Sequence, residues 1–192
     1  MSIALGSLAA YSIARYKTGD ENLSFWILSI RMAPPVDEVL PIFVIMRFAR
    51  LIDSYAALIL TYFLFNLPFA VWLIKGFLEQ IPWDIEGAAL VDGFNRFQVF
   101  RRIALPLAVP ALIVTGLFCF IFLWNEFLLA LVLTRSRVVT LPVVISGMVG
   151  GHEIMWGETS ALAVLTSLPV VVLALLLQRY LVRGPTLGAM RG

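Results

Sequence analysis

The sequence has few residues of the kinds that build metal, redox or hydrolytic sites. It contains one cysteine, Cys119, and one histidine, His152, in 192 residues. One cysteine cannot form an internal disulfide, and a protein-built zinc site needs three or four convergent ligands, usually histidine or cysteine. The motifs HExxH, GxSxG and GxxxxGK[ST] are absent. A disulfide scaffold is therefore excluded, and the common hydrolase and nucleotide-binding classes lose their usual signals.

Charged residues are also scarce. They make up 14% of the chain, whereas soluble domains contain about a quarter. Hydrophobic residues make up 61%, and the formal net charge is only +2. This is more apolar surface than one soluble core of this length can bury, so a disordered chain and a nucleic-acid binder are excluded. The composition predicts an integral membrane protein in contact with lipid.

Apolar runs divide the chain into predicted membrane helices. A helix that spans a bilayer needs about 20 mostly apolar residues. Four runs reach this length, at 24–47, 54–77, 105–133 and 160–181, and prolines inside them predict kinks. The run at 1–16 is shorter and is typical of the second half of a helix. We therefore expect an all-α, polytopic transmembrane helix bundle of about five helices, the first incomplete, forming one domain over residues 1–192.

The segments between the runs predict a topology. Residues 79–106 form a polar loop, 134–159 a second connection and 182–192 a short basic tail. Basic residues are more numerous on the side of the first loop and the tail, so the positive-inside rule places these two in the cytoplasm and 134–159 outside. His152 then lies in an external loop, and we assign it no role.

Polar residues inside the apolar runs are candidates for a solute path, because charges within a bilayer are expensive. Arg31, Asp37 and Glu38 fall in one predicted helix. The alternative roles are ion pairing or hydrogen bonding between helices and a position near the lipid headgroups. Asn66 could instead hydrogen-bond a backbone carbonyl freed by Pro68, and Trp124 could simply pack against its neighbours. The candidates for the path are Asn66, Trp124, Asn125 and Glu126.

The loop at 79–106 predicts two short helices. Pro82 suits a helix start, and Asp84 and Glu86 suit its positive N-terminal end. Gly93 is expected to end this helix, and a second helix with several aromatic side chains follows. Such a pair would form a docking surface for a cytoplasmic partner, although an ordinary solvated loop fits the composition equally well.

The spacing in this loop resembles a known motif. Ala88-Ala89, three residues, Gly93, nine residues and Ile103-x-Leu105-Pro106 match the EAA loop of ABC importer permeases, E-A-A-x3-G-x9-I-x-L-P. One position departs: the glutamate position is Gly87, and Glu86 lies one residue earlier. The flanking sequences Asn66-Leu67-Pro68-Phe69, Trp124-Asn125-Glu126-Phe127 and Gln178-Arg179-Tyr180 resemble the carbohydrate-uptake, maltose-type branch of that family.

The resemblance implies a type I ABC importer permease fold and an N-terminally truncated second permease subunit for a sugar or polyol, in a bacterial or archaeal cytoplasmic membrane. It implies three kinds of partner: an ATPase dimer, a second permease and an extracytoplasmic sugar-binding protein. The chain itself would bind no cofactor and catalyse no reaction, since ATP and magnesium belong to the ATPase. The loop residues that the resemblance assigns to ATPase coupling are Glu86, Gly87, Ala88, Ala89, Asp92, Gly93, Phe94, Phe97, Ile103, Leu105 and Pro106.

Three alternatives remain open from the sequence. The short first run also fits a remnant that no longer assembles. The loop motif is shared with permeases for amino acids or phosphate, so only the flanking matches favour sugars. An intramembrane hydrolase is disfavoured because no nucleophile and base are paired.

Overall fold

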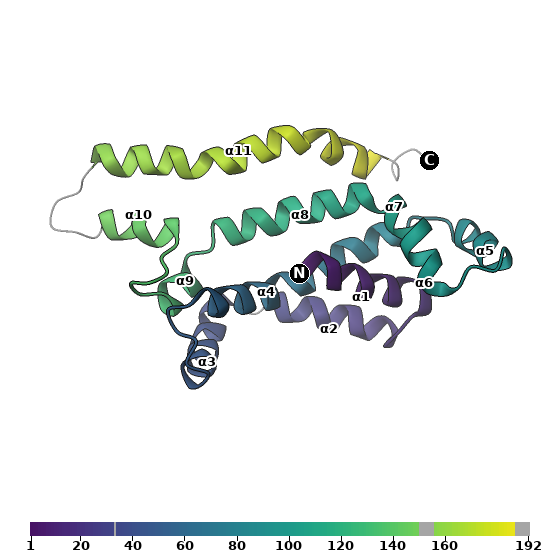
Figure 1. Ribbon diagram of the computed structural model, residues 1–192, viewed down its shortest axis with the longest axis horizontal. Coiled ribbons are helices and arrows are strands. Elements are labelled where there is room, and N and C mark those ends of the chain that lie inside the picture. Colours follow the sequence, from purple (N-terminus) through teal and green to yellow (C-terminus); the bar gives the residue numbers. More distant parts are fainter. Residues whose placement is uncertain (33, 150–155, 187–192) are drawn as a thin grey trace. The chain divides into compact units, whose positions relative to one another are not determined.

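The computed structural model describes residues 1–32, 34–149 and 156–186, and the regular elements in these ranges are helices (Figure 1). The prediction of an all-α fold is confirmed. The elements are α1 (Ser2–Tyr16), α2 (Asp20–Met32), α3 (Pro35–Phe48), α4 (Tyr55–Leu78), α5 (Trp83–Val91), α6 (Arg96–Val99), the π-helical turn η1 (Phe100–Ala104), α7 (Leu105–Leu107), α8 (Val109–Trp124), α9 (Leu128–Leu133), α10 (Leu141–Val149) and α11 (Trp156–Thr186).

Among the described residues, two helices are long and apolar enough to cross a membrane by length and composition. They are α4 and the part of α11 from Trp156 to Gln178. A third span is formed if Arg96–Leu107 and Val109–Trp124 are taken as one broken helix, bent by 71°. Helix α4 continues through Pro68, as the sequence predicts for residues 54–77.

The described residues fall into two compact units. The first takes in 1–32, 65–119 and 177–186, and the second 34–64, 120–149 and 156–176. A single transmembrane domain over the whole chain stays a prediction.

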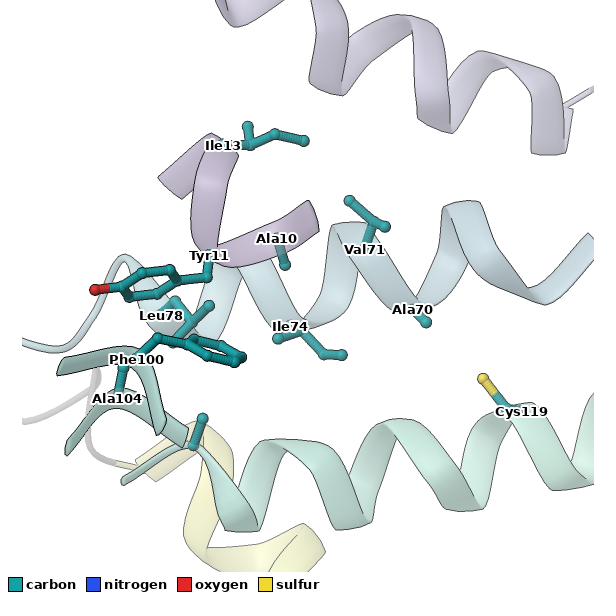
Figure 2. Packing of buried hydrophobic residues seen from close by; sticks show 11 residues of the cluster. Ala10, Tyr11, Ile13, Ala70, Val71, Ile74, Leu78, Phe100, Ala104 and Cys119 are labelled. Carbon is teal, nitrogen blue, oxygen red and sulfur yellow. The ribbon is translucent and has the colours of Figure 1, made fainter. Parts of the chain in front are cut away.

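The core of the first unit is built from α1, α4, the segment around η1, and α8 (Figure 2). Gly6 of α1 faces α4 so closely that a Cβ atom there would lie 3.1 Å from the Cβ of Ala70. Small residues allow this close approach of two helices. The buried side chains of this core are Ala10, Tyr11, Ile13, Ala70, Val71, Ile74, Leu78, Phe100, Ala104, Ala108 and Cys119.

In the second unit, Asp53 fixes the turn before α4 to the segment after α9. Its backbone N–H donates to the carbonyl of Leu133 at 2.8 Å, and its carboxylate accepts the backbone N–H groups of residues 135–138 at 2.9 to 3.3 Å. Asp53 has a φ of 61°, a conformation that most residues avoid. These donors, that of Arg137 above all, hold the pKa of Asp53 well below its usual range.

The predicted helix at 24–47 is wrong, because the chain forms two helices there. Proline disfavours helical geometry in the residue before it, and Pro35 occupies the first turn of α3. Arg31 therefore belongs to α2, whereas Asp37 and Glu38 lie in the first turn of α3, where the helix dipole favours acidic side chains.

The predicted single helix at 105–133 is also wrong, because it is divided into α7, α8 and α9. Pro110 lies in the first turn of α8, and a proline ring clashes with the carbonyl four residues earlier. Asn125 and Glu126 therefore lie in the break between α8 and α9 rather than in one helix. The connection at 134–159 contains α10, and His152 lies outside the described residues.

Candidate functional site

The loop at 79–106 folds as predicted at its first helix. Pro82 precedes α5, and Asp84 and Glu86 lie in its first turn. The helix ends at Val91, and Gly93 follows with a φ of +90°. Glycine adopts this conformation at no steric cost, so the chain reverses here sharply.

The second part of the loop starts with a capping box. The Asn95 side chain accepts the backbone N–H of Gln98 at 2.9 Å, and the Gln98 side chain accepts that of Asn95 at 2.9 Å. This reciprocal pair satisfies the free donors at the start of α6, so the second helix begins at Arg96. The π-helical turn η1 follows and contains Ile103. π-helical turns often occur at functional sites.

Glu86 is fully buried and makes contacts within the chain. One oxygen, Oε1, accepts Arg15 Nε at 2.7 Å and lies 2.7 Å from Nη2 of the same guanidinium. The other, Oε2, accepts the hydroxyl of Tyr11 at 2.8 Å. The Arg15 guanidinium also donates to the carbonyl of Ile81 at 3.0 Å. The glutamate next to the motif therefore faces α1 rather than the surface of the loop.

Aromatic side chains at the end of α1 extend this contact to α6 and η1. The Tyr11 ring lies 4.9 Å from the Phe100 ring, and Figure 2 shows both beside Leu78. The Arg96 guanidinium lies 4.7 Å from the centre of the Tyr16 ring, a cation–π distance. The end of α1 thus holds both halves of the loop.

Four large apolar side chains of the loop are exposed. Trp83 and Ile85 are each 46% exposed, Phe97 is 63% exposed and Val91 is 88% exposed. Aromatic side chains such as those of Trp83 and Phe97 are enriched at the centres of protein interfaces. Sequence reasoning found Phe97 but missed the other three, whose apolar character gave no motif signal.

The remaining predicted coupling residues divide between this surface and the interior. Ala88, Asp92, Gly93 and Pro106 are exposed, whereas Ala89 is buried. Half-buried positions are occupied by Gly87, Phe94, Ile103 and Leu105.

Asn125 and Glu126 close the break between α8 and α9. The Asn125 side-chain amide donates to the carbonyl of Ile121 at 2.8 Å, at the end of α8. The Glu126 carboxylate accepts the backbone N–H groups of Leu129 and Ala130 at 2.8 and 3.0 Å, and the hydroxyl of Tyr62 at 3.0 Å. Both side chains thus satisfy helix ends that would otherwise lack partners.

A hollow of about 380 Å³ lies beside this break. The Trp124 indole N–H donates to the carbonyl of Thr166 at 2.9 Å, which ties α8 to α11 there. Whether these residues line a solute path stays a prediction. The residues around the hollow are Asn125, Phe127, Pro142, Ile145, Ser146 and Thr166.

Asn66 lies apart from this group, buried in α4 with 1% of its surface exposed. Neither polar atom of its side chain has a hydrogen-bond partner in the part of the chain that the structure describes. The expected bond to a carbonyl freed by Pro68 is therefore wrong, and α4 tolerates the proline without it. Within the described ranges, no three His, Cys, Asp or Glu side chains gather to hold a metal ion.

Comparisons with known proteins cover almost the whole chain. Residues 2–186 match the family model described as "binding-protein-dependent transport system inner membrane component". A trehalose transport system permease protein of Mycobacterium tuberculosis is 39% identical over 100% of this chain and 72% of its own length. A trehalose/maltose transport system permease protein of Thermococcus litoralis is 36% identical over 100% and 70%.

Two further similarities agree with these. A diacetylchitobiose uptake system permease protein of Streptomyces coelicolor is 36% identical over 99% of this chain and 69% of its own. A crystal structure of a bacterial ABC transporter involved in the import of alginate shares the fold, with a TM-score of 0.74 and 23% identity over 93% of this chain and 68% of that one. The chain therefore belongs to the family of binding-protein-dependent transport system inner membrane components and is a multi-pass permease subunit of an ABC importer.

Proposed function

We propose that this permease subunit imports a sugar or polyol across a bacterial or archaeal cytoplasmic membrane, and that an extracytoplasmic binding protein delivers the solute. The observation that carries the proposal is the similarity, over nearly the full chain, to permeases named for trehalose, trehalose/maltose and diacetylchitobiose. A second permease subunit would complete the path, and an ATPase dimer would bind ATP and magnesium.

The ATPase contact is assigned to the loop at 79–106. Trp83, Ile85, Val91 and Phe97 are the large exposed apolar side chains of its two helices and are here called the loop surface. The turn at Gly93 fixes the angle between those helices. The loop surface suits a cleft in a partner protein, because apolar and aromatic side chains anchor the centres of interfaces.

The solute path is assigned to the break between α8 and α9. Asn125 and Ser146 supply polar groups to the hollow, and Phe127 supplies an aromatic face. Sugar hydroxyls need hydrogen-bond partners, and ligand sites combine apolar walls with a few polar groups. Trp124 and Glu126 support this break. Asn66 belongs to the first unit and stays a candidate from the sequence.

The experiment is purification of the natively expressed, C-terminally tagged chain in mild detergent, followed by mass spectrometry and by uptake assays in proteoliposomes. We expect to recover an ATPase, a second permease and a binding protein, and to observe ATP-dependent uptake of an oligosaccharide. Uptake of an amino acid or phosphate instead would refute the sugar assignment. Recovery of the chain alone would refute the importer complex.

A matched pair of variants tests the loop surface. V91D places a charge on it, and V139D makes the same change at a 44% exposed valine in the segment before α10. We expect V91D to lose the ATPase in the purification and V139D to keep it. Equal recovery with both variants would contradict the assignment of the loop surface.

A further inference from the structure

The contact between Glu86 and α1 is more than a local packing detail. Helix α5 buries only two side chains, those of Glu86 and Ala89. An alanine contributes little apolar area and Leu90 is only half-buried, so apolar packing holds α5 weakly. The directional bonds of Glu86 join this helix to α1.

These bonds use both carboxylate oxygens and reach one helix. Oε1 faces the Arg15 guanidinium, and Oε2 faces the Tyr11 hydroxyl, one turn earlier on α1. The side chain of Arg15 is 6% exposed and that of Glu86 is 0% exposed. Water therefore does not compete for this pair, and its geometry is defined by the two helices alone.

Arg15 also joins the start of α5 to the same point. It donates to the carbonyl of Ile81 at 3.0 Å, and its guanidinium lies 5.9 Å from the centre of the Trp83 ring. The Ile81 carbonyl, the Trp83 ring and the Glu86 carboxylate thus all contact the Arg15 guanidinium. A displacement of α5 has to move α1 with it or break these contacts together.

We propose that Arg15, Glu86 and Tyr11 form the joint through which movement of the loop at 79–106 is transmitted to α1. The inference rests on the proposed function of that loop as the ATPase contact. The three are positioning residues. Buried ion pairs contribute little net stability compared with apolar side chains of similar volume, so their directional geometry is the property that an apolar replacement would lose.

The test separates coupling from folding. The variant R15M/E86L removes both charges and keeps the volume, and it is studied in the complete transporter in proteoliposomes. We expect it to assemble with the ATPase and hydrolyse ATP, while the solute transported per ATP falls by about tenfold, as for mutations along a coupling network. The control K75Q removes the exposed pair between Lys75 and Glu79 (3.0 Å) and should keep the ratio.

A milder variant decides the outcome if R15M/E86L does not assemble. Y11F removes one hydrogen bond and keeps the ring contact with Phe100, and we expect it to lower the ratio about threefold. If R15M/E86L assembles and the solute transported per ATP is unchanged, the inference is overturned. If R15M/E86L does not assemble, an unchanged ratio in Y11F overturns it. In both cases the proposed function still stands. If the unaltered chain binds no ATPase, the proposed function fails and the inference fails with it.

Discussion

Replacing Glu86 with leucine should destabilise the first unit strongly. The carboxylate is fully buried, and its loss leaves the Arg15 guanidinium, 6% exposed, without its counter-charge. Removing one partner of a buried ion pair costs about 3–5 kcal/mol, because the remaining charge is buried unpaired. Tyr11 loses a hydrogen bond as well, which adds about 1 kcal/mol. We therefore expect E86L to lower the free energy of unfolding by about 5 kcal/mol.

The chain carries its own reporter for this measurement. Cys119 is the single cysteine, is 6% exposed, and belongs to the same buried cluster as Tyr11. A fluorogenic maleimide added to the purified chain in detergent will react with this thiol as heating unfolds the first unit. A loss of about 5 kcal/mol predicts a lower midpoint by on the order of 10 °C.

Two controls decide whether the buried pair is the cause. D84L makes the same type of change at an exposed acid in the first turn of α5, where only the helix-dipole contribution of about 0.3–1 kcal/mol is lost. R15M/E86L leaves no buried charge and should return to within about 1–2 kcal/mol of the unaltered chain. The reasoning is refuted if E86L behaves like D84L, or if the double variant is as unstable as E86L.

Three further changes have defined outcomes. G87A should raise the free energy of unfolding by about 0.5–1 kcal/mol, since alanine is the better helix former and its Cβ would meet only Trp83 at 3.6 Å; a lower melting midpoint would contradict this. G93V should cost about 1–3 kcal/mol, since its φ is +90° with open space around it, and should lower transport per ATP without unfolding the helices; unchanged solute-stimulated ATPase activity would count against it. The pKa of Asp53 is held low by the backbone N–H groups of Arg137 and its neighbours, so its stabilisation is complete above about pH 4 and is lost only as the pH falls through the lower folded pKa. D53N should therefore lower the melting midpoint equally at pH 7 and pH 5, and a difference that vanishes at pH 5 would refute the assignment.

Most of the secondary structure follows from local pattern. The apolar run at 54–77 predicts α4 because its length and composition are those of a membrane helix, and the proline–glycine spacing predicts α5 and the turn at Gly93. The errors fell where a break depends on a few side chains. The continuity expected across Pro34–Pro35 and across Asn125 failed because proline geometry and side-chain capping outweigh apolar composition at a helix end.

The sequence by itself determined that this is a helical membrane permease and where the loop that carries the motif lies. These properties follow from runs, spacing and motif, which are all local. Only the tertiary structure decided what Glu86 does, because its partners Arg15 and Tyr11 lie 71 and 75 residues away in the chain. The sequence pattern of a charged residue next to a motif is the same whether that residue contacts a partner protein or the first helix of its own chain. Burial and directional hydrogen bonds distinguish the two, and they exist only once the helices have packed.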